Sequence, residues 1–98
     1  MFVRVLTMRV VAERLDDWFR FTSDVGFPGM RRQPGCRGIW RLQRHGVANE
    51  YEVVTLWDSL ADLEHFRASD AMHELSAAAA GLTVPPYSEA LFDLIEDS

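Results

Sequence analysis

Two histidines, His65 and His73, are the side chains in this sequence best suited to moving a proton at neutral pH. An imidazole with no perturbing neighbours titrates near ~6.5, which suits a general base or a proton relay. On one unbroken helix a step of eight residues would place the two about 80° apart, but Ser69-Asp70 between them predicts a break. A metal site would need a third ligand, and His45 belongs to a distant predicted hairpin, so we expect no metal.

The elements that would position these histidines begin with a β-branched run, Phe2–Val11, which predicts a strand. From Ala12 the apolar spacing becomes helical, on a face formed by Leu15, Trp18, Phe19, Thr22 and Val25. Gly26-Phe27-Pro28-Gly29 predicts a break or kink in this helix, because proline lacks an N–H and glycine adds backbone freedom.

The rest of the chain alternates between strand and helix patterns. Ser59-x-x-Asp62 resembles a capping box, and Ser69-Asp70 predicts the cap of a further short helix. The expected elements are a strand over 36–44, a hairpin connection over 45–49, a strand over 50–57, a helix from residue 60, a helix ending near Ala80, and a strand over 87–96. This order, βαββαβ, predicts an α+β fold, a ferredoxin-like antiparallel sheet with helices on one face.

Both faces of this sheet are predicted to be apolar. In the first strand Phe2, Leu6, Met8 and Val10 point to one side, and Val3 and Val5 point to the other. Two helices cover only one face, whereas an antiparallel sheet with a wet face normally alternates apolar and polar residues. The uncovered face therefore needs a partner, and we expect a second copy, giving an obligate homodimer.

Composition and length limit the number of domains, the classes of partner and the location that we expect for this protein. The 98 residues predict a single domain over 1–98, and the formal net charge of −5 argues against nucleic acid as a partner. No apolar stretch approaches the ~20 residues of a membrane helix, and no signal peptide opens the chain. With Cys36 as its only cysteine, the chain has no internal disulfide framework. We expect a cytoplasmic protein with no membrane partner.

Three segments together resemble the antibiotic biosynthesis monooxygenase (ABM) family, whose members form dimeric α+β barrels. They are the first strand, Pro34-Gly35-Cys36-x-Gly38, and Val53-Val54-Thr55-x-Trp57-x-Ser59 leading into Leu63-x-His65, and they span roughly residues 2–75. The resemblance implies cofactor-independent oxidation of a phenolic or quinol-type aromatic molecule by O2. Such an enzyme supplies an apolar slot, a base or relay, and a donor for the developing oxyanion. No cofactor is implied.

The family also contains haem-degrading proteins, and this chain departs from their pattern. That branch uses an asparagine in the first strand, a tryptophan in the second helix and a haem-ligating histidine further on. The matching positions here are Thr7, Phe66, and Leu75 or Ser76, while His73 lies two or three residues early. Haem degradation is therefore disfavoured.

The resemblance assigns provisional roles to several residues. His65, or else His73, would move the proton, and Arg9 would stabilise the oxyanion; the alternatives are a histidine bonded to a backbone carbonyl and an arginine in a salt bridge. Substrate-lining residues would be Thr7, Trp57, Phe66 and Trp40. Trp57 has the alternative role of a wedge that fixes the second helix on the sheet, and Trp40 that of a core or dimer-interface residue.

Two functions follow from these observations. The first is a cofactor-independent monooxygenase acting on a small aromatic substrate. The second is a non-catalytic dimeric protein, ligand-binding or structural, that keeps the barrel without the chemistry. The two differ in whether the cavity between helices and sheet is open or filled.

Overall fold

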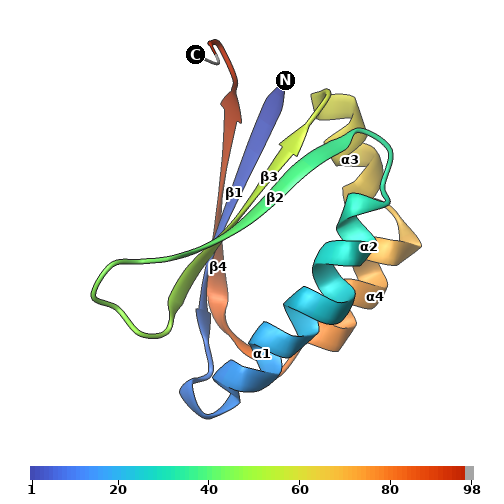
Figure 1. The fold of residues 1–98 in the computed structure, drawn as a ribbon. Coiled ribbons are helices and arrows are strands. Elements are labelled where there is room, and N and C mark those ends of the chain that lie inside the picture. The colour runs from blue at the N-terminus through green and yellow to red at the C-terminus, as the bar shows by residue number, and fades with distance from the viewer. Residues whose placement is uncertain (97–98) are drawn as a thin grey trace.

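The computed structural model describes residues 1–96 and shows four antiparallel strands with helices packed on one face of the sheet (Figure 1). The strands lie in the order β2-β3-β1-β4. Their bounds are β1 Phe2–Val10, β2 Cys36–Gln43, β3 Glu50–Trp57 and β4 Thr83–Asp93. The predicted α+β, ferredoxin-like arrangement is confirmed, and the sheet leaves one broad face without helices.

The first helical segment is continuous, so of the break or kink predicted at Gly26–Gly29 the break does not occur, and the helical geometry changes there instead. It consists of a 3₁₀ turn, an α-helix, a π-helical segment and a second α-helix: η1 Ala12–Arg14, α1 Leu15–Phe21, η2 Thr22–Gly26 and α2 Phe27–Arg31. The Phe27 N–H donates to Thr22 O, a π-type bond, and Pro28 follows in the first turn of α2. Proline is tolerated in that turn, where a missing N–H costs little.

Two serines begin the next helices as predicted. Ser59 caps α3 (Leu60–Arg67) by accepting a hydrogen bond from the Asp62 N–H. Ser69 caps α4 (Asp70–Ala79) by accepting one from the Met72 N–H. Each cap satisfies a backbone donor that the first helical turn leaves without a partner. His65 and His73 therefore belong to two separate helices.

The last strand starts earlier than predicted. It begins at Thr83, includes Pro85-Pro86 and ends at Asp93, whereas the alternation predicted 87–96. β4 lies at the edge of the sheet, and Pro85 and Pro86 fall between the pairs Arg9–Val84 and Thr7–Ser88, where β4 does not pair in register with β1. The pairing of β1 with β4 shifts register between Thr7 and Arg9.

The core fills the space between the sheet and the helices. One buried cluster includes Met8, Val10, Trp18, Phe27 and Tyr51. A second consists of Trp57, Leu63 and Phe66, in which the two aromatic rings stack with centroids 5.3 Å apart. This stack holds α3 against the end of β3, which supports the alternative role of Trp57 as a wedge.

The opposite face of the sheet is apolar and open. Val3 and Val5 pair in register with Leu56 and Val54 of β3, and these positions alternate with the buried residues of both strands. Trp40 of β2 also lies opposite Val54 and is 49% exposed. The expectation of two apolar faces is confirmed. Among the described residues, no helix combines the length and the apolar character needed to cross a bilayer.

Candidate functional site

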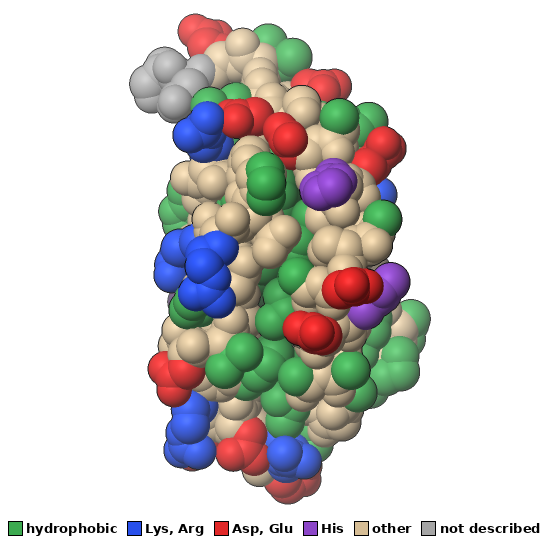
Figure 2. All heavy atoms as spheres, turned by 90° about the vertical axis from the view of Figure 1, so that its right-hand side faces the viewer, with side chains coloured by type: hydrophobic (Ala, Val, Ile, Leu, Met, Phe, Trp, Pro, Cys, Tyr) green, Lys and Arg blue, Asp and Glu red, His purple; other side chains and the backbone are tan. Residues whose placement is uncertain are grey.

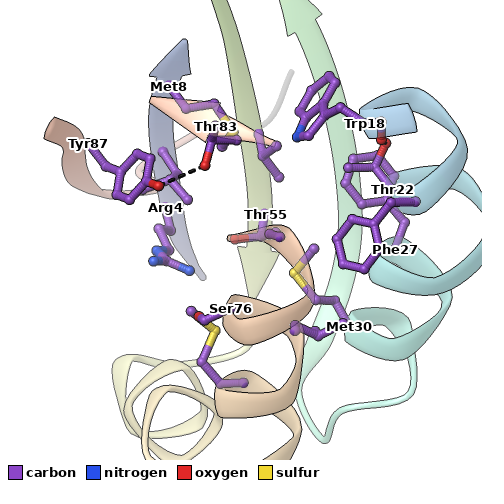
Figure 3. A pocket seen from close by; sticks show the side chains of 16 residues that line it. Arg4, Met8, Trp18, Thr22, Phe27, Met30, Thr55, Ser76, Thr83 and Tyr87 are labelled. Atoms are coloured by element: carbon purple, nitrogen blue, oxygen red, sulfur yellow. Dashed lines mark hydrogen bonds between the residues drawn. The ribbon is translucent and has the colours of Figure 1, made fainter. Parts of the chain in front are cut away.

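A cavity of about 240 Å³ lies between the helices and the sheet. Its walls come from β1, β3 and β4 on the sheet side, and from α1, η2, α2 and α4 on the helix side (Figure 3). Figure 2 shows hydrophobic side chains running down the middle of the helix-bearing face. The predicted space between helix faces and sheet is therefore open rather than filled.

The wall on the first helical segment is aromatic. Trp18, Phe21 and Phe27 line the cavity from α1 and α2. Trp18 is 2% exposed, and its ring packs against that of Tyr51 with centroids 4.8 Å apart. A planar apolar ligand would find complementary ring faces along this wall.

Thr22 and Arg41 fix this wall in place. The Thr22 hydroxyl donates to the Trp18 carbonyl at 2.9 Å and accepts a 2.6 Å hydrogen bond from Arg41 Nη1. The guanidinium of Arg41 lies over the ring of Phe19, 4.5 Å from its centroid. The cation–π contact thus ties β2 to α1, and the short hydrogen bond ties β2 to the π-helical segment.

Methionines form much of the remaining lining. Met8, Met30 and Met72 reach the cavity from β1, α2 and α4, and they are three of the four methionines in the chain. Unbranched thioether side chains adapt to ligands of different shape. The cavity is therefore apolar and compliant on these sides.

The charged group of the cavity is Arg4 on β1. Its side chain is 10% exposed, and its Nε donates a 2.7 Å hydrogen bond to Glu89 Oε2 of β4. The other carboxylate oxygen of Glu89 pairs with Arg67 of α3. Burial lowers the pKa of Arg4 from its usual value, yet a guanidinium remains charged at neutral pH.

Polar groups without charge complete the lining. Thr55 lies opposite Arg4 in the β1–β3 register and accepts a 2.8 Å hydrogen bond from Trp57 Nε1. Tyr87 of β4 shares a 2.7 Å hydrogen bond with Thr83. The arrangement is thus an apolar, aromatic slot with one buried cation.

The sequence profile of the antibiotic biosynthesis monooxygenase family matches residues 1–78. The chain belongs to this family. A search of curated proteins gave no match.

Solved structures of similar fold include several described as ABM proteins. A putative ABM from Bordetella bronchiseptica has a TM-score of 0.86 at 17% identity and covers 97% of each chain. One from Caulobacter crescentus has a TM-score of 0.85 at 19% identity, covering 97% of this chain and 90% of that chain. A haem-degrading protein of Mycobacterium tuberculosis with two haems bound has a TM-score of 0.77 at 20% identity, covering 100% and 99%. At these identities the likeness concerns the fold.

Two predicted ABM site residues, Thr7 and Arg9, lie on the far side of the sheet from the cavity. They alternate along β1 with Leu6 and Met8, which line it. Thr7 Oγ1 is 3.5 Å from Glu52 Oε1 on that far face. This placement corrects the expectation that Thr7 and Arg9 point between helices and sheet, because neighbouring strand residues point to opposite faces.

The other predicted residues also lie outside the lining. Trp57 and Phe66 are buried in the stack beneath α3, and Trp40 is on the open face. His65 and His73 are exposed on α3 and α4, and neither lines the cavity. The structure therefore does not bring the seven predicted residues together.

The positions equivalent to the haem-ligating histidine of the family, Leu75 and Ser76, do line the cavity. Among the described residues, the lining contains no histidine.

The sequence analysis missed Arg4, the charged lining residue. The sequence did contain a signal for Arg4, because Arg4 lies on the same face of β1 as Phe2, Leu6 and Met8. A charge on the apolar face of a strand is a functional candidate, since buried charges need a partner or a purpose. Trp18 was expected only on the apolar face of the first helix, and nothing in its spacing marked a cavity.

Proposed function

We propose that this ABM protein is a cofactor-independent monooxygenase that oxidises a phenolic or quinol-type aromatic small molecule with O2. The observation that supports this most directly is the open cavity, which has an aromatic wall and one buried cation. The substrate ring would lie along Trp18 and Phe27, and its developing oxyanion would face Arg4 rather than the predicted Arg9.

The chemistry needs no external reductant. In an anthrone-type substrate, one carbon bearing two hydrogens becomes a ketone, one atom of O2 enters the product and the other leaves as water. The substrate carbon supplies all four electrons, and its anion passes the first of them to O2. The protein would bind and orient the anion and exclude water from the slot.

The alternative is a non-catalytic dimeric ligand-binding or structural barrel. The observation that favours it is that the predicted histidines do not line the cavity. Proton-transfer roles for His65 and His73 remain predictions from the sequence. A cytoplasmic location is likewise a prediction.

We also propose that the open face of the sheet pairs with a second copy. Val3, Val5, Trp40 and Phe92 lie on this face, and Trp40 and Phe92 are 49% and 53% exposed. A contiguous apolar face of this kind is typical of an interface, and sheet-on-sheet packing would bury it.

Oxygen uptake by the purified protein with anthrones, naphthols and hydroquinones tests the proposed activity. We expect saturable uptake with at least one of these compounds without added cofactor, and ¹⁸O from ¹⁸O2 in its product. Tight binding of the same compounds without uptake would support the binding protein instead. Uptake that requires an added flavin or metal would contradict a cofactor-independent reaction.

A further inference from the structure

We infer that Arg4 makes this cavity selective for aromatic monoanions, and that the protein takes its substrate already ionised because the described residues that line the cavity include no base. The inference rests on the proposed function for its substrate and deepens it to a chemical class. That class consists of phenols acidified by a conjugated carbonyl group and of enolic 1,3-dicarbonyl compounds.

The first observation is the way in which Arg4 is held. Its Nε is bound to Glu89, but its two Nη nitrogens have no hydrogen bond to any residue within 1–96. No buried side-chain nitrogen or oxygen among these residues lacks a partner, so the Nη atoms are not fully buried, and Arg4 is one of the residues that line the cavity. Figure 3 shows the guanidinium projecting from β1 toward α4, where Ser76 lies. A guanidinium with Nε anchored presents its Nη donors in a fixed orientation to an oxyanion or carboxylate.

The second observation is the local charge. Arg4 and Arg67 share the single carboxylate of Glu89, which leaves one unit of positive charge in this cluster. Other elements that line the cavity near Arg4 contribute no charge. They supply Val53 and Thr55 from β3, and Met72, Leu75, Ser76 and Ala79 from α4. A ligand with one negative charge would balance the cluster in an apolar setting where an unbalanced charge is costly.

The third observation concerns bases. The described lining contains no carboxylate, imidazole or amine side chain, and its two ionisable side chains are the Arg4 guanidinium and the Tyr87 phenol. Glu89 beside Arg4 has both carboxylate oxygens engaged by guanidinium groups. The proton must therefore leave the substrate to solvent, and Arg4 stabilises the anion that remains. Neutral phenols with pKa near ~10, such as an unsubstituted tyrosine-like ring, would be poor substrates at pH 7.

A matched pair of probes tests the selectivity directly. Binding of 1-naphthoate and of neutral 1-naphthamide is measured by calorimetry on the wild-type protein, without O2 turnover. We expect naphthoate to bind at least tenfold more tightly. Equal affinity, or tighter binding of the amide, would overturn the inference without any variant having to fold.

Two variants then assign the preference to Arg4. Arg4→Met should abolish the preference for naphthoate, and Arg4→Lys should keep part of it, since charge is retained without the fork of donors. A preference that persists in a folded Arg4→Met protein would overturn the assignment. If Arg4→Met does not fold, Arg4→Lys carries the test, and an undiminished preference in it would contradict the role of the guanidinium geometry.

The missing base is tested by the pH dependence of kcat/KM across phenols of different acidity. The midpoint should follow the pKa of each substrate. A single midpoint of the kcat/KM profile shared by all substrates would reveal a base on the enzyme and would overturn the inference that the substrate is taken up already ionised. Anion preference without oxygen uptake would refute the proposed function and leave Arg4 as an anion site. Oxygen uptake without a preference for anions would refute the anion site at Arg4 and leave the proposed monooxygenase function standing.

Discussion

The indole nitrogen of Trp57 donates a 2.8 Å hydrogen bond to Thr55 Oγ1, and the two residues are 0% and 2% exposed. Thr55 also lines the cavity. One hydroxyl therefore connects the stack that holds α3 with the wall of the slot.

Replacing that hydroxyl should destabilise the fold. Thr55→Val keeps the shape but leaves Trp57 Nε1 buried without an acceptor, which costs about 1–3 kcal/mol in free energy of unfolding. Thr55→Ser, which keeps the hydroxyl, is the control and should lose less. Urea unfolding measures both, and a Val variant as stable as the Ser variant would show that the bond contributes nothing.

Trp40→Glu should separate the proposed dimer into monomers. The substitution places a charge on the open apolar face, where a partner sheet would bury it. The control is Val25→Glu, an exposed apolar residue on the helical side that should not affect assembly. Light scattering should give twice the 11.2 kDa chain mass for the wild type and the Val25 variant. A wild type that is monomeric at micromolar concentration would refute the dimer.

His65→Ala separates the role predicted from sequence from the role that the cavity supports. His65 is exposed and does not line the cavity, so we expect turnover to fall less than twofold. Arg4→Met should lower kcat/KM at least tenfold in the same oxygen assay. A loss of turnover in His65→Ala with an intact fold would restore the histidine as the proton-transfer residue and contradict a base-free cavity.

Cys36 should react slowly with alkylating agents. Burial raises the pKa of its thiol, which outweighs the hydrogen bond from the Gly38 backbone and the nearby charge of Arg31. A raised pKa means a smaller thiolate fraction at any given pH below it, and the thiolate is the nucleophile. At pH 8 the native protein should take up iodoacetamide more slowly than the urea-unfolded chain, followed by mass spectrometry. Equal rates would contradict the burial argument.

Local signals in the sequence account for most of the fold. The helix caps at Ser59 and Ser69 and the strand Glu50–Trp57 were predictable, because capping and alternation act over a few residues. The course of the first helix was not predictable in this way. A π-helical segment lies directly before α2, and its Thr22 accepts a hydrogen bond from Arg41 of the distant strand β2, a contact that no local pattern predicts.

The site was predicted less well than the fold. The resemblance identified the family, but it assigned roles by matching positions along the sequence. In β1 the matched residue Thr7 points away from the cavity, whereas its neighbour Leu6 lines it, because adjacent strand residues point to opposite faces. The cavity itself joins residues from β1, α1, α2 and α4, which no local pattern connects. Arg4 alone carried a readable signal, as a charge on an apolar strand face.

The central proposal for this protein is that its substrate is oxidised in the cavity between the helices and the sheet. Ser76 lines the cavity and its neighbour Ala77 does not, although both are exposed on α4, so a tryptophan at each gives a matched pair. Oxygen uptake with the best substrate should fall at least tenfold in Ser76→Trp and remain near wild type in Ala77→Trp. Full activity in a folded Ser76→Trp protein would contradict this location.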